Sequence, residues 1–199
     1  MIEIRRDGER YELTLSEDCR APADVVYALL TDLSTHMEWG GSWHPSRTQR
    51  LMSMDAPARQ AIRGMEFEST GSAGGGCWHD RSKVTEVEPS AVFEFETRGT
   101  MRDGQGVERM KLHAIHRYQL APLEPGTRIT YACSATLTLA SSRGDHHPRL
   151  PAVIFNLVVP AVVERGTKNL ILMAEERAGL APVEARPGPR REPLPEGAG

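Results

Sequence analysis

The chain has 199 residues, of which 39% are hydrophobic and 26% are charged, and its formal net charge is −3 at pH 7. This length and composition favour one folded, soluble domain with a sizeable core, and they exclude the low-hydrophobicity, high-charge profile of a disordered protein. A net charge so close to zero provides no broad basic surface for a phosphate backbone, so we do not expect a nucleic acid as partner.

Neither the N-terminus nor the cysteines carry a targeting or crosslinking signal. The first segment, MIEIRRDGERYELTL, has no apolar core region, and no stretch reaches the roughly 18 apolar residues of a membrane span. We therefore expect a cytoplasmic protein without stable membrane insertion. Cys19, Cys77 and Cys133 are far apart and form no CxxC pair, which favours reduced thiols over a disulfide framework or a metal site.

The first elements are a strand and a short helix. Residues 10–19 alternate apolar Tyr11, Leu13 and Leu15 with polar neighbours, which predicts a half-buried strand. A helix is predicted directly after Pro22, because proline suits a first helical turn and the following apolar residues have helical spacing. A second turn or short helix is expected near 34–39.

Six further strands follow, which brings the predicted total to seven. The first of them, at 47–54, has a weak signal, and the others alternate clearly, at 65–70, 78–88, 91–99, 107–120 and 127–140. In the strand at 107–120, alternation places His116 on the inner face with Leu112 and Tyr118. It places His113 on the outer face, so His113 and His116 do not form a metal-binding pair.

The end of the chain is predicted to be a long helix followed by a tail. Residues 148–179 carry apolar side chains at helical spacing, and Pro160 should kink or break this helix because it removes a backbone hydrogen bond. Residues 180–199 are rich in proline, glycine and charge, which predicts a disordered tail outside a single domain at 1–179.

This order of elements predicts an α+β fold, and the residues at its joints match a family pattern. The matching segments are APADVVY at 21–27, TD at 31–32, Trp39, Trp78, VTEVEP at 84–89, FEF at 93–95 and GTRITY at 126–131. Over roughly residues 10–178 the chain resembles the START-like or SRPBCC superfamily, particularly its polyketide cyclase/dehydrase and lipid transport branch. The resemblance implies a helix-grip fold, in which a seven-stranded curved antiparallel sheet, two short helices and a long C-terminal helix enclose a cavity.

Two functions remain open for such a chain. The first is binding of a small hydrophobic ligand, lipid-, quinone- or polyketide-like, in the internal cavity. The alternative is a cofactor-independent polyketide cyclase or dehydratase that uses acid and base residues of that cavity. Neither function needs a cofactor, and the absence of GxSxG, HExxH, P-loop and GxGxxG motifs argues against a nucleotide-dependent enzyme.

The candidate catalytic residues are polar side chains expected on the inner face. His116 can act as a general acid or base near neutral pH, unless it is simply a hydrogen-bonded core histidine. The phenols of Tyr118 and Tyr131 can hydrogen-bond a carbonyl oxygen, although both also fit as core tyrosines. Asp80 shares strand parity with Val84 and, if buried, needs a partner such as His116 or an arginine.

The candidate ligand contacts are the large apolar residues that these predicted elements turn inward, together with tryptophans near the expected cavity entrance. They are Trp39, Trp43, Phe67, Trp78, Phe93, Phe95, Leu112, Phe155 and Val159.

Overall fold

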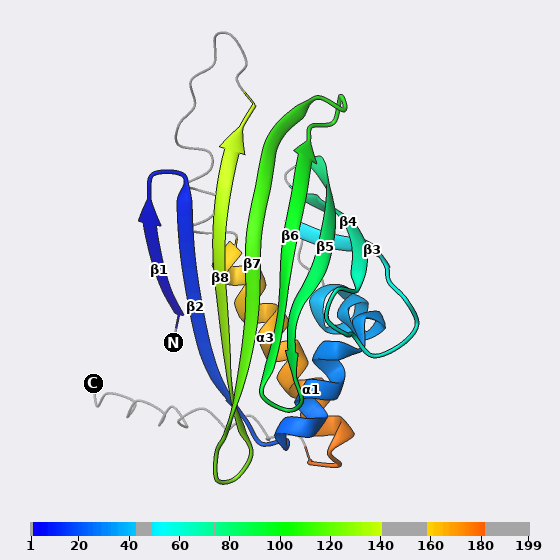
Figure 1. The fold of residues 1–199 in the computed structure, drawn as a ribbon, viewed down its shortest axis with the longest axis vertical. Helices are drawn as coiled ribbons and strands as arrows, with labels where there is room; N and C mark the ends of the chain where they lie inside the picture. Colours follow the sequence, from blue (N-terminus) through cyan, green and yellow to red (C-terminus); the bar gives the residue numbers. More distant parts are fainter. Residues whose placement is uncertain (1, 43–48, 74, 141–158, 182–199) are drawn as a thin grey trace, which may run out of the picture.

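The computed structural model of the chain describes residues 2–42, 49–73, 75–140 and 159–181. It contains an antiparallel eight-stranded sheet with the strand order β1-β2-β8-β7-β6-β5-β4-β3 (Figure 1). The strands are β1 (Ile2–Asp7), β2 (Arg10–Cys19), β3 (Gln49–Asp55), β4 (Glu66–Ala73), β5 (Gly76–Glu88), β6 (Val92–Arg102), β7 (Glu108–Pro122) and β8 (Thr127–Leu139). The helices are α1 (Ala23–Thr31) and the C-terminal α3 (Val159–Arg177). The α+β class expected from the sequence is therefore correct.

The predicted number of strands, seven, is wrong by one, because β1 was missed. Ile2 and Ile4 alternate with charged residues and pair with Leu15 and Leu13 of β2. Gly8 makes the tight turn between the two strands, with a φ of 59° that favours glycine. An Asp-Gly pair between alternating segments is a hairpin signal, so this strand could have been found in the sequence.

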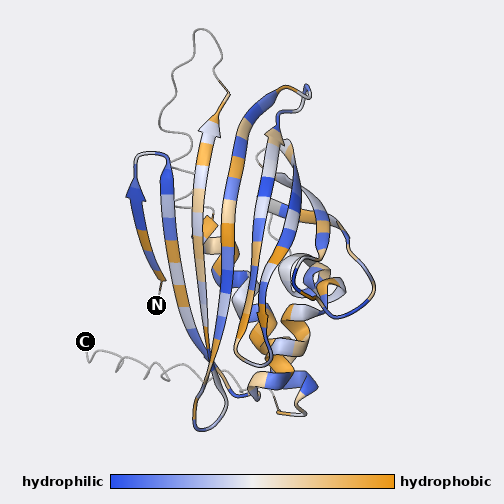
Figure 2. Cartoon of the chain, viewed as in Figure 1, coloured by the Kyte–Doolittle hydropathy of each residue, from blue (hydrophilic) through white to orange (hydrophobic). Residues whose placement is uncertain are grey.

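The strands alternate between a buried and an exposed side, as their sequences predict. In β7, Ala114, Tyr118 and Leu120 are buried, whereas His113 and Ile115 are exposed. Figure 2 shows the same alternation as bands of hydrophobic and hydrophilic residues along the strands. The predicted assignment of side chains in this strand to the two faces is therefore confirmed, and His116 lies on the side of the buried residues.

Helices α1 and α3 both pack against that side of the sheet, which we call the inner face (Figure 1). In α1, the predicted apolar stripe is buried at Val26, Leu29 and Leu30. Pro22 occupies the position just before the helix. The second turn or short helix predicted near 34–39 consists of a 3₁₀ turn at Leu33–Thr35 and a π-helical turn at Glu38–Ser42.

The C-terminal helix is buried through Leu170, Met173 and Ala174. Residues 148–158 of the predicted helix lie outside the described residues, and so does the segment needed to test a kink at Pro160. None of the helices within the described ranges is long and apolar enough to cross a membrane.

The end of α3 is closed by a cap that reaches beyond the predicted domain boundary at 179. Gly179 has a φ of 71°, and the next residue, Leu180, donates its backbone N–H to the carbonyl of Glu175. The Arg20 guanidinium bonds both the Glu175 carboxylate and the carbonyl of Ala181. Contacts with the domain therefore continue to residue 181, and the rest of the predicted tail, 182–199, lies outside the described residues.

Candidate functional site

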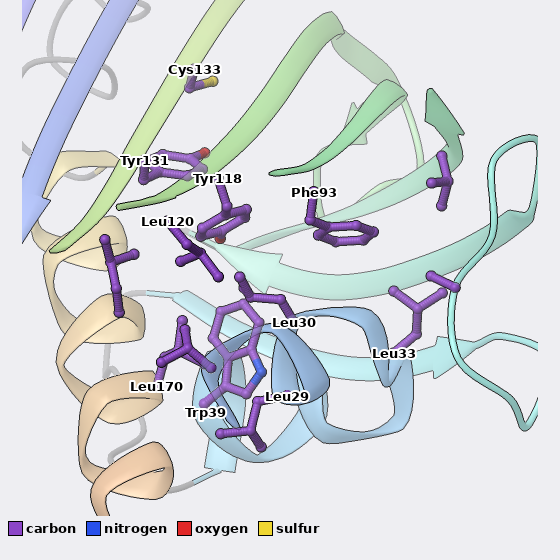
Figure 3. Packing of buried hydrophobic residues seen from close by; sticks show 14 of the residues in the cluster. Leu29, Leu30, Leu33, Trp39, Phe93, Tyr118, Leu120, Tyr131, Cys133 and Leu170 are labelled. Carbon is purple, nitrogen blue, oxygen red and sulfur yellow. The ribbon is translucent and has the colours of Figure 1, made fainter. Parts of the chain in front are cut away.

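A row of aromatic side chains crosses the inner face from β4 to β8. Phe95 is at its centre, with ring centroids 5.4 Å from Phe67, 5.6 Å from Phe93 and 4.7 Å from His116. Strand pairing explains this arrangement, because Phe95 is opposite His116 and Phe93 is opposite Tyr118. Figure 3 shows Phe93, Tyr118 and Tyr131 pointing from the sheet toward Trp39 and the leucines of the helical segments.

His116 is held in this row by two contacts. Its ring stacks on Phe95, and its Nδ1 lies 2.7 Å from the hydroxyl of Tyr131 on β8. Burial lowers the pKa of His116 from 6.5 to about 4, so the ring is neutral at pH 7. A neutral imidazole has one donor and one acceptor nitrogen, so the hydrogen bond at Nδ1 leaves Nε2 for another partner.

The groups around His116 are hydrogen-bond donors and not bases. Burial raises the pKa of Tyr118 and, well above its ordinary value, that of Tyr131. Burial also raises the pKa of the neighbouring Cys133 thiol to about 11. All three groups are therefore protonated at neutral pH, and a phenol in this state can donate to a carbonyl oxygen but cannot remove a proton.

Asp80 lies on the inner face of β5, but it does not meet His116. It pairs with Gly99 of β6, and Gly99 pairs with Leu112 of β7. Leu112 precedes His116 by four residues, which is about 13 Å along a strand. The expected contact between Asp80 and His116 is therefore not formed, because strand register separates them.

The carboxylate of Asp80 is largely surrounded by protein. Burial raises its pKa from 3.8 to about 6, and the charge of His79 opposes this shift. A Cβ added at Gly99 would lie 2.0 Å from Oδ1 of Asp80, so the glycine provides the space that the carboxylate occupies. Gly99 was missed at the level of sequence, although a glycine inside a strand often marks such a close approach.

Three polar groups of the inner face lack a hydrogen-bond partner among the described residues: His116 Nε2, the Tyr118 hydroxyl and the Asp80 carboxylate. Among the described residues, the only side-chain nitrogen or oxygen that is both fully buried and without a hydrogen-bond partner is Nε of Arg20, so none of these three groups is fully buried. Each of the three groups therefore keeps some accessible surface, although each belongs to the side of the sheet that the helices cover.

The predicted ligand contacts divide into three sets. Phe67, Phe93 and Trp39 are core residues with at most 7% exposure, and the carbonyl of Trp39 accepts a hydrogen bond from Asn169 of α3. Partly accessible residues form the second set, namely Trp78, Phe95 and Leu112 on the inner face and Val159 at the start of α3. Trp43 and Phe155 lie outside the described residues.

The outer face carries a separate set of charged contacts. His113 lies 2.8 Å from the Glu96 carboxylate there, on the opposite side of β7 from His116. The described ranges contain no group of three or more histidine, cysteine or acidic side chains that could hold a metal ion.

The fold occurs in solved structures of proteins with very different sequences. An uncharacterized protein from Rhizobium leguminosarum matches 88% of this chain and 99% of its own, with a TM-score of 0.57 and 13% identity. A conserved protein from Geobacillus kaustophilus matches 84% and 95%, with a TM-score of 0.56 and 11% identity. A protein of unknown function from Staphylococcus aureus matches 86% and 97%, with a TM-score of 0.55 and 11% identity.

No protein-family model matches the chain, and no curated protein matches it either. At identities this low, structural likeness reports architecture and carries no information about ligand or reaction. What the chain shares with these bacterial proteins is thus its fold, an antiparallel sheet with a C-terminal helix against one face.

Proposed function

We propose that this protein binds a small hydrophobic ligand between the inner face of its sheet and the helices, in the cavity of a helix-grip fold of the START-like type. The observation that carries the proposal is the set of partly accessible side chains on that face. Phe95, Leu112 and Trp78 offer apolar surface, and His116 Nε2 and the Tyr118 hydroxyl offer hydrogen bonds. Small-molecule sites have this composition, with mostly apolar walls and a few polar groups that orient the ligand.

The energetic argument points the same way. A buried polar group without a partner costs about 1–3 kcal/mol, so native cores satisfy nearly all such groups. His116 and Tyr118 instead leave a nitrogen and a hydroxyl open beside aromatic rings. A ligand with an apolar body and a carbonyl or hydroxyl oxygen would satisfy both groups.

The test is a titration with the neutral fluorescent probe N-phenylnaphthylamine. The protein should bind it with increased fluorescence, and Leu112→Gln, which makes the inner face more polar, should weaken binding about fivefold through the loss of about 1 kcal/mol of apolar contact. Ile115→Gln is the matched control, because Ile115 lies on the outer face of the same strand with 42% exposure. Absence of probe binding, or equal effects of the two substitutions, would contradict the proposal.

A polyketide cyclase or dehydratase is the second candidate, and the geometry of His116 favours it. The hydrogen bond between Nδ1 and the Tyr131 hydroxyl orients the imidazole, and in the tautomer that carries its proton on Nδ1 the Nε2 atom can accept a proton from a bound substrate. His116→Phe should then reduce cyclisation of a linear polyketide thioester about a hundredfold while probe binding persists. His113→Phe, on the outer face, should leave both turnover and probe binding unchanged. Equal turnover in the unmodified protein and both variants would contradict the cyclase proposal and leave ligand binding as the proposed function.

A further inference from the structure

Two inner-face side chains of β5 each lie over a glycine of a neighbouring strand. Trp78 pairs with Gly71 of β4, and a Cβ added there would lie 2.0 Å from Cζ2 of the indole. Asp80 pairs with Gly99 of β6, where an added Cβ would lie 2.0 Å from Oδ1. The two side chains therefore lean to opposite sides, and the glycines make the room that each one needs.

The protein supplies no partner for the Asp80 carboxylate within the described ranges. Its neighbours across the sheet are Ser69 and Gly99. The nearest hydroxyl on its own strand, Ser82, is hydrogen-bonded to Thr97 at 2.9 Å. The adjacent residues His79 and Arg81 are exposed on the outer face, and both contact the Glu68 carboxylate. A carboxylate that is largely removed from water and left without a donor is expensive for the fold, so a partner from outside would be strongly favoured.

We infer that Asp80, in the space that Gly99 leaves open, forms a subsite for the protonated amino group of an amphipathic ligand. The inference rests on the proposed hydrophobic-ligand site and names the chemical class that the site takes. A carboxylate makes its strongest hydrogen bonds with a charged donor, and a protonated amine supplies one. A single carboxylate does not provide the several ligands that a metal ion needs.

The spacing of the polar groups defines the shape of this ligand. Asp80 and His116 are about 13 Å apart along the strands, with Leu112 in the cross-strand row of Asp80 and Phe95 in the row of His116. A ligand with its amino group at Asp80 would extend its apolar body along β6 and β7 toward the aromatic row.

The experiment compares three amphiphiles of one chain length, dodecylammonium, dodecanol and dodecanoate, as competitors of bound N-phenylnaphthylamine. We expect the unmodified protein to bind dodecylammonium at least about tenfold more tightly than dodecanol, and dodecanoate most weakly. Asp80→Asn should abolish the preference for ammonium and leave the affinity for dodecanol unchanged. Asp7→Asn, with the same charge change at the end of β1, is the control and should retain the preference.

A second variant moves the Asp80 carboxylate from its position while it keeps the negative charge. In Gly99→Ala the new methyl group displaces the Asp80 carboxylate, while its distance of 3.5 Å to Cβ of Leu112 is an ordinary contact, so the sheet should remain intact by circular dichroism. Loss of the ammonium preference in Gly99→Ala supports the subsite.

The outcomes separate this inference from the proposed function. If the protein binds dodecanol but shows no preference for ammonium, the subsite is wrong and the hydrophobic site remains. The same holds if the preference survives in Asp80→Asn or in Gly99→Ala. If none of the three amphiphiles displaces the probe and the probe itself does not bind, the proposed function fails.

Discussion

Asp80 is a residue whose charge should weaken the fold at neutral pH. Burial raises its pKa from 3.8 to about 6, so between these pH values the folded chain holds the proton more tightly than the unfolded chain does. The resulting stabilisation is complete below about pH 4 and is lost as the pH rises through 6. A site for a cationic ligand would account for a residue that lowers stability at the pH of the cell.

Asp80→Asn should therefore stabilise the protein more at high pH than at low pH. Because a neutral side chain does not titrate, the gain in the free energy of unfolding at pH 8 should exceed the gain at pH 5 by about 1 kcal/mol. Urea denaturation at the two pH values measures the difference. Burial also lowers the pKa of His116 and of the core residue His36 to about 4, but both histidines are present in the two proteins, so their contributions cancel. Equal gains at pH 5 and pH 8 would show that the carboxyl is not desolvated in the folded state.

At the scale of elements, α3 contributes to the core through one side only. Leu170 has no exposed surface and lies among the buried residues below the sheet (Figure 3), whereas Leu172 on the same helix is 45% exposed. The stability of a surface helix comes mainly from the face that it buries.

Two alanine substitutions two residues apart should therefore differ strongly. Leu170→Ala should lower the free energy of unfolding by about 2–5 kcal/mol, because it removes apolar contacts and leaves a cavity. Leu172→Ala should change it by no more than about 0.5 kcal/mol. Urea denaturation of both variants measures this, and similar losses would mean that α3 packs through a different side.

For the whole molecule, the boundary of the domain is set by the cap of α3. Removal of residues 182–199 should leave the melting temperature nearly unchanged, because their composition offers little apolar surface to bury. Removal of Gly179, Leu180 and Ala181 as well would break the bonds to Glu175 and Arg20, at a cost of about 1 kcal/mol or about 2–4 °C. Differential scanning fluorimetry of the two truncated chains measures this difference. Equal melting temperatures would show that this boundary is wrong.

The faces of the strands could be predicted from local periodicity. Side chains alternate along an extended backbone, so the pattern around His116 was enough to place it on the inner face and His113 on the outer one. The same kind of reasoning found the buried stripe of α1 and the apolar side of α3. The hairpin of β1 was within reach as well, since its Asp7-Gly8 signal is local.

The contacts across the sheet could not be obtained in this way. Periodicity tells which face a residue occupies but not which residue of another strand lies opposite, because register depends on hydrogen bonds between segments far apart in the chain. For this reason the hypothesis could only suggest His116 or an arginine as the partner of Asp80. In the fold, the Asp80 carboxylate lies over Gly99, and His116 is hydrogen-bonded to Tyr131. Alternation thus selects the side chains that face the helices, and strand pairing determines which of them meet and which polar groups remain open to a ligand.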